Sequence, residues 1–235
     1  MLVEMKNKNI FIMEDDFQGC NNDIHQLVDK YLKGKFKNSL IEIISDSYCQ
    51  DDTSCICNFN FASKKSLVKV NFVELTFNIE SIEQIELTCN NLVNDAYSLI
   101  DKTHEDVDKQ NRDQIVALLV RKINNFDYLD KKYIIDFFND IFLDILTEHK
   151  LINGNKRMAY AVLRVLLSRS GFYLKYTQIS GRENLKKNSE ANIKKIKGML
   201  EKYEEDESLD SRLETLRLKT KKFIEDNIII SCLLY

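Results

Sequence analysis

The stretch HKLINGNKR, from His149 to Arg157, combines residue types suited to proton transfer and anion binding. Gly154 and Asn155 both tolerate left-handed backbone conformations, so they can turn successive amide N–H groups towards one point. Lys156 and Arg157 follow at the expected start of a helix, where free amides and the helix dipole favour an anion. Because cations in a first helical turn normally cost about 0.3–1 kcal/mol each, their presence predicts an anionic ligand.

His149 lies eight positions before Arg157, at the expected end of the preceding helix. Histidine is the side chain best suited to accept a proton near neutral pH. A base beside a phosphate-binding loop indicates transfer of a phosphate-containing group to a hydroxyl. The spacing alone fits an ordinary helix–loop–helix corner equally well, because Gly-Asn is a common loop pair and the helix dipole favours a C-terminal histidine.

Amphipathic helices on both sides must position this stretch. Ser81 and Gln84 match a capping box, and an apolar stripe at helical spacing follows as far as Ile100. Further helices are expected at about residues 112–123 and 130–148, separated by polar breaks.

The helix after the motif is expected from Lys156 to about Ser170. It is apolar on most sides, which is typical of a helix at the centre of a bundle. Gly171 is its expected C-terminal cap. Residues 184–226 then form a charged pair of amphipathic helices.

Composition bounds the class of protein. The chain has 235 residues, of which 44% are hydrophobic and 30% charged, and its formal net charge is -3. It therefore lacks the basic surplus of a general nucleic-acid binder. No apolar run is long enough for a signal peptide or a membrane span. We expect a cytoplasmic protein that binds neither nucleic acid nor membranes.

The nine residues from His149 to Arg157, with a helix expected on each side, resemble the motif of the Fic/Doc family. The family pattern is His-Pro-Phe-x-acidic-Gly-Asn-Gly/Lys-Arg. The segment LLSRSGFYL (Leu166 to Leu174) also resembles the end of the family's central helix, and the likeness covers about Ile82 to Tyr176. The resemblance implies an all-α helical bundle core that transfers a phosphoryl or nucleotidyl group from ATP to a protein hydroxyl.

The resemblance also implies roles for single residues. His149 matches the base that deprotonates the acceptor hydroxyl, and Arg157 matches the group that stabilises developing charge. Asn153 takes the place of the acidic residue that holds Mg²⁺. The phosphates of ATP would bind to the loop formed by Asn153, Gly154, Asn155, Lys156 and Arg157.

Two partners follow from the same resemblance. The segment from Asn124 to Asp130 would be the flap that docks the target protein. The inhibitory helix of some members has the pattern Ser/Thr-x-x-x-Glu-Gly/Asn, which the nearest segment, Ile179 to Asn184, does not match. Any inhibitor would therefore be a separate antitoxin protein.

This sequence departs from the family pattern at positions that differ between the branches of the family. Lys156 replaces the second glycine of AMP-transferring members, and Tyr160 replaces a further arginine of theirs. Both changes favour Doc-like transfer of the terminal phosphate, and the resemblance to this branch implies the toxin of a toxin–antitoxin pair. Asn153 offers Mg²⁺ a neutral oxygen, which binds more weakly than a carboxylate. The alternatives are AMP transfer to a protein hydroxyl and a non-catalytic Fic-fold binding protein.

The first eighty residues differ from the rest. Asn22 to Leu32 has helical spacing, whereas Ser66 to Ile79 predicts a strand in a hairpin with residues around 55–61. The predicted fold is therefore mainly α. It has three parts: an N-terminal accessory α/β region at residues 1–80, a Fic/Doc-like catalytic core at 81–180 and a C-terminal helical extension at 181–235.

Overall fold

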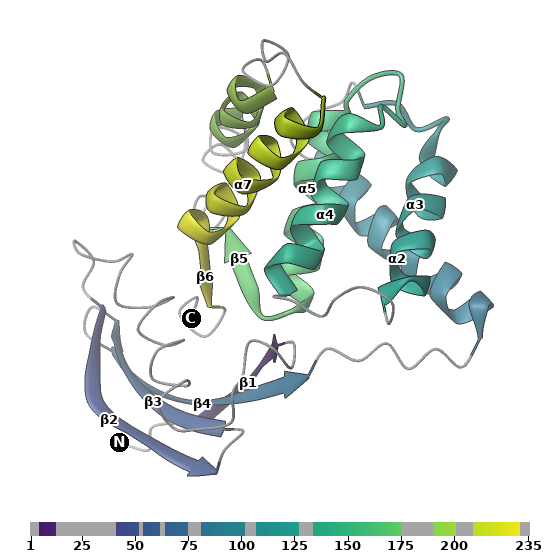
Figure 1. The fold of residues 1–235 in the computed structure, drawn as a ribbon. Helices are drawn as coiled ribbons and strands as arrows, with labels where there is room; N and C mark the ends of the chain where they lie inside the picture. The colour runs from purple at the N-terminus through teal and green to yellow at the C-terminus, as the bar shows by residue number, and fades with distance from the viewer. Residues whose placement is uncertain are drawn as a thin grey trace.

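The computed structural model describes nine segments of the chain (Figure 1): residues 5–12, 41–51, 54–61, 64–74, 81–101, 107–126, 134–174, 190–200 and 209–230. The helix expected at Asn22 to Leu32 and the segment Ile179 to Asn184 lie outside them. From Ser81 onward the described residues are mainly helical, which confirms the predicted α character of this part. No helix among the described residues is long and apolar enough to cross a membrane.

Four strands precede the helices and form one sheet with the order β1-β4-β3-β2. β1 and β4 are parallel, whereas the pairs β3–β4 and β2–β3 are antiparallel. The pair β3–β4 is the expected hairpin. The mixed α/β character of this region stays a prediction, because its expected helix is not among the described residues. The strands are β1 (Met5–Ile12), β2 (Ile41–Asp51), β3 (Ser54–Phe61) and β4 (Lys64–Glu74).

The helical core follows the expected order, with bounds within a few residues of those predicted. Its helices are α2 (Ile82–Asp101), α3 (Arg112–Asn124), α4 (Ile134–Thr147) and α5 (Asn155–Arg169). The start of α2 matches the predicted cap, since the backbone N–H of Gln84 donates to Ser81 Oγ at 3.3 Å.

α5 is the central helix, as its apolar composition predicts. It packs against both α2 and α4, and Met158, Val162 and Leu167 are each 0% exposed. Gly171 follows the helix with φ 83°, the left-handed conformation expected of a C-terminal cap. Because α5 packs against two helices, its first turn is held at a fixed place at one end of the bundle.

The C-terminal part is joined closely to this core. Its elements are β5 (Phe172–Leu174), a helix of residues 190–200, α7 (Leu209–Asn227) and β6 (Ile228–Ile230). β6 pairs antiparallel with β5, and α7 packs on α4, where Lys221 Nζ lies 2.6 Å from Asp136 Oδ1. Residues of the predicted core and of the predicted extension therefore share one hydrophobic core.

Candidate functional site

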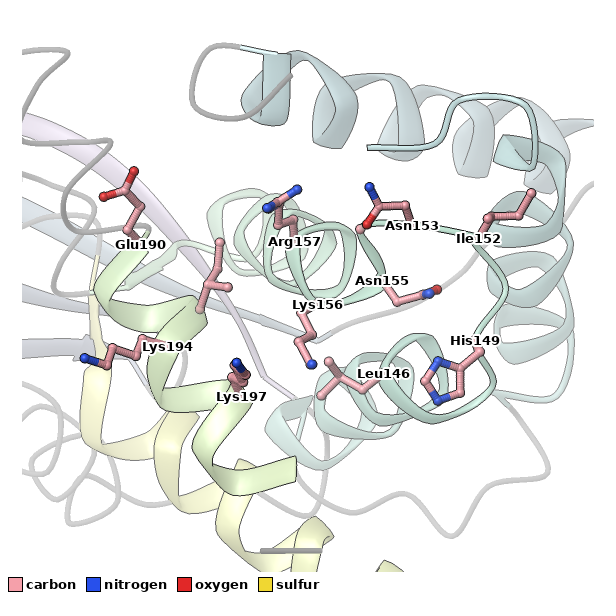
Figure 2. Close-up of a pocket in the computed structure, with 12 residues that line it drawn as sticks. Leu146, His149, Ile152, Asn153, Asn155, Lys156, Arg157, Glu190, Lys194 and Lys197 are labelled. Carbon is pink, nitrogen blue, oxygen red and sulfur yellow. The ribbon is translucent and has the colours of Figure 1, made fainter. Parts of the chain in front are cut away.

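One pocket lies between the first turn of α5 and the helix of residues 190–200 (Figure 2). Its volume is about 640 Å³, and pockets for small molecules typically measure about 300–1,000 Å³. All six residues predicted to act at the site line it: His149, Asn153, Gly154, Asn155, Lys156 and Arg157. The structure therefore brings the predicted site residues together.

Gly154 precedes α5 in the left-handed conformation that its residue type predicts, with φ 89° and ψ 12°. Its carbonyl oxygen accepts the first helical hydrogen bond, from Met158 N at 2.9 Å. Val107 packs directly against it, so a Cβ at this position would lie 2.9 Å from both Val107 methyl carbons. Glycine is favoured here, because both the conformation and the close contact disfavour a side chain.

Asn155 closes the loop. Its Nδ2 donates to Leu151 O at 2.6 Å, and its Oδ1 accepts from Leu151 N at 2.9 Å. Leu151 itself is 2% exposed, so its side chain is part of the core. Both polar atoms of the Asn155 side chain therefore bond within the loop, which holds Leu151 and Asn155 together.

Asp108 supports the loop from the other side, and the sequence did not predict it. Its N–H donates to Asn153 O at 3.2 Å, and its carboxylate accepts from Ile152 N at 3.3 Å. The pKa of Asp108 is lowered, first by the hydrogen bond from the Asn111 side chain and then by that from the Gln110 backbone. In sequence Asp108 resembles a simple turn residue before α3, since nothing local indicates its contacts with the motif.

Tyr97 links Asp108 to α2. Its hydroxyl donates to Asp108 O at 2.7 Å. Burial, followed by the negative charge of Asp108, raises the pKa of Tyr97 to about 12. The hydroxyl therefore keeps its proton, and the hydrogen bond, throughout the neutral range.

His149 is exposed at the rim of the pocket, just beyond α4. Its φ of 47° makes it the one non-glycine residue with positive φ in the described part of the chain. Such a conformation costs about 1–2 kcal/mol for a residue with a Cβ. Strain of this kind is often found at functional sites.

The neighbouring Glu148 fixes the end of α4. Its carboxylate lies 2.9 Å from Arg121 Nη2 and 2.9 Å from Lys150 Nζ. Burial alone would raise the pKa of Glu148, but the hydrogen bonds from Lys150 and Arg121 outweigh this effect and lower it. Lys150, which stands where the family has proline, thus anchors the loop through Glu148.

Positive charge dominates the pocket. Lys156 and Arg157 come from α5, and Lys194 and Lys197 from the helix of residues 190–200. Glu190 is the one carboxylate among the described residues that line the pocket. Four cations and one carboxylate give a local formal charge of about +3, in a chain whose net charge is -3. The two lysines of the C-terminal part were missed, because their helical pattern indicates only a solvated face.

The donor set for a metal is small. No group of three His, Cys, Asp or Glu side chains that could hold a metal occurs among the described residues. Asn153 offers one amide oxygen, and Glu190 lies on the other side of the pocket (Figure 2). Mg²⁺ commonly binds through one or two protein oxygens plus substrate phosphates. A Mg²⁺ ion carried by a nucleotide would need no more from the described residues than the amide oxygen of Asn153.

No family model matches the chain, and neither curated proteins nor solved structures give a match. Membership of the Fic/Doc family therefore stays an inference from the motif. The geometry of the loop from His149 to Arg157 does not depend on that inference.

The predicted flap, Asn124 to Asp130, is described in part. Asn124 ends α3, and Phe126 is 3% exposed with its ring centroid 5.0 Å from that of Phe137. Residues 127–130, the rest of the predicted flap, lie outside the described part of the chain.

Tyr160 is 2% exposed and accepts a hydrogen bond from Asn192 Nδ2 at 2.9 Å, so it joins two helices.

Proposed function

We propose that this protein is a Doc-like phosphotransferase that moves the γ-phosphoryl group of ATP to a side-chain hydroxyl of a target protein, as the toxin of a toxin–antitoxin pair. The main support is that all six predicted site residues of the motif line one cationic pocket at the start of α5. This arrangement offers a proton acceptor and an anion site in one cavity of suitable size.

In the proposed reaction the phosphates of ATP bind along the first turn of α5, where Lys156 and Arg157 lie. His149 accepts the proton of the target hydroxyl. The hydroxyl oxygen attacks the γ-phosphorus, and the bond between this phosphorus and the bridging oxygen breaks, so ADP leaves with the bond electrons. Arg157 stabilises the charge on the phosphoryl group during transfer.

Asn153 would hold Mg²⁺ together with the phosphate oxygens. When bound, this ion would neutralise part of the negative charge of the phosphates. Because the protein contributes a neutral ligand, we expect the ion to bind mainly as part of the nucleotide.

Radiolabelled ATP tests the proposal. The full chain is incubated with bacterial lysate and with ATP labelled at either the γ- or the α-phosphate. We expect protein label from γ-labelled ATP alone and a loss of this label in His149→Ala. Lys195→Ala is the matched control, since Lys195 does not line the pocket.

Two other outcomes would replace the proposal. Label from α-labelled ATP would assign AMP transfer to the same site. The absence of label from either nucleotide, unchanged in His149→Ala, would assign a non-catalytic binding protein. Expression alone should also slow bacterial growth, and His149→Ala should relieve this effect.

A further inference from the structure

The pocket has a second cationic wall that lies outside the motif. Lys194 and Lys197 are exposed residues of the helix of residues 190–200, and both line the pocket. Figure 2 shows Lys156 extending from α5 towards Lys197, with Leu146 beside them. A ligand that contacts the cations of both helices is favoured when it is anionic.

This helix is held firmly against α5. Ile196 is 0% exposed and Leu200 is 8% exposed, so one face is part of the hydrophobic core. Asn192, 1% exposed, donates from its Nδ2 to the Tyr160 hydroxyl on α5 at 2.9 Å. A buried polar contact of this kind fixes how two helices are rotated relative to each other. Lys194 and Lys197 directly follow Ile193 and Ile196, so they lie on the flank of the buried face and line the pocket at a defined position.

The cations of the pocket form two groups. Lys156 and Arg157 are consecutive in an α-helix, so their side chains leave the axis about 100° apart. In Figure 2 Arg157 lies beside Asn153, whereas Lys156 points to the side where Lys197 lies. Because the two groups point to different sides of the first turn of α5, a chain of phosphates suits them better than a single phosphate group.

We propose that the helix of residues 190–200 forms the second wall of a polyphosphate site, in which Lys156 and Lys197 bind one part of the chain and Arg157 binds another. Lys194 adds charge at the outer edge of the same wall. The inference deepens the proposed function, on which it rests for the presence of a nucleotide in this pocket. The ligand class is a triphosphate, either of a nucleoside or inorganic.

Calorimetric titration of the full chain with ATP, AMP and inorganic tripolyphosphate tests this inference. We expect ATP and tripolyphosphate to bind more tightly than AMP. Replacing both lysines (Lys194→Ala with Lys197→Ala) should weaken triphosphate binding about 5- to 30-fold, because each surface charge contact contributes modestly. AMP binding should change less than threefold or so, because it engages only one of the two cationic groups.

Matched variants make the result specific. Lys195→Ala removes the same charge from the same helix but not from the pocket, so its triphosphate affinity should stay at the wild-type value. Lys197→Arg keeps the charge and should keep the affinity, which tests the role of Lys197 even if the alanine variant is less stable. Equal losses in Lys195→Ala and Lys197→Ala would overturn the inference.

The two proposals can fail separately. If triphosphates bind through Lys197 but no γ-label is transferred, the phosphotransferase proposal is wrong and the polyphosphate site stands. If label is transferred while the double alanine variant binds ATP like the wild type, the second wall is refuted and the reaction stands. If tripolyphosphate and ATP both fail to bind the wild type, both proposals are refuted.

Discussion

Replacing Gly154 with alanine should destabilise the loop that carries the site. The left-handed conformation, φ 89°, costs about 1–2 kcal/mol in a residue with a Cβ. The added carbon would also lie 2.9 Å from both Val107 methyl carbons and 3.1 Å from Val107 Cα, and overpacking of this kind costs about 1–3 kcal/mol. Reduced freedom of the unfolded chain returns about 0.4–1 kcal/mol, which leaves a net loss of roughly 1–4.5 kcal/mol.

Urea unfolding followed by circular dichroism measures this loss as a lower midpoint. Gly198→Ala is the matched control, since it adds the same carbon in a helix where nothing lies within 4 Å. Alanine in a helix interior should stabilise the protein by about 0.5–1 kcal/mol relative to glycine. The two variants should therefore move the midpoint in opposite directions.

A double variant separates the two causes. Val107→Ala removes both methyl carbons that meet the new Cβ but leaves the backbone contact and the positive φ. The combination with Gly154→Ala should therefore be less destabilised than the sum of the single variants, by about 0.5–2 kcal/mol. A Gly154→Ala protein within about 0.5 kcal/mol of the wild type would refute the reasoning, because surface changes without a structural cause have effects of that size.

The remaining predictions concern His149, Asp108 and Cys89. His149→Asn should keep the free energy of unfolding within about 0.5 kcal/mol of the wild type, because Asn tolerates the left-handed conformation. The rate at which label is transferred should fall about 10²–10⁴-fold, because the base is lost. An unchanged rate would exclude His149 as the base. Because the pKa of Asp108 is lowered, its carboxylate stabilises the fold above the unfolded-state pKa of about 3.8 and the effect is lost as the pH falls further. Unfolding midpoints between pH 6 and 3 should thus decline less in Asp108→Asn than in the wild type, and parallel curves would contradict this role. Burial and then the charge of Glu86 raise the pKa of Cys89 to about 12, so mass spectrometry should find it alkylated at pH 8 only after unfolding.

Local information in the sequence predicted the helices and the loop that joins two of them. The cap at Ser81, the apolar faces of the helices and the glycine at position 171 each depend on neighbours within a few residues. The same holds for Gly154, whose left-handed conformation follows from its residue type and its place before a helix. The motif residues therefore had to lie close together, since they are consecutive.

Contacts between distant segments decided the rest of the site. The bond from Ile152 N to Asp108 spans 44 residues, and that from Asn192 to Tyr160 spans 32. No periodicity or spacing indicates such pairs, because each depends on how whole helices pack. The sequence by itself determined which loop holds the candidate site residues. Only the tertiary structure decided that Asp108 supports this loop and that Lys197 faces it, because packing alone sets the position of one element against another.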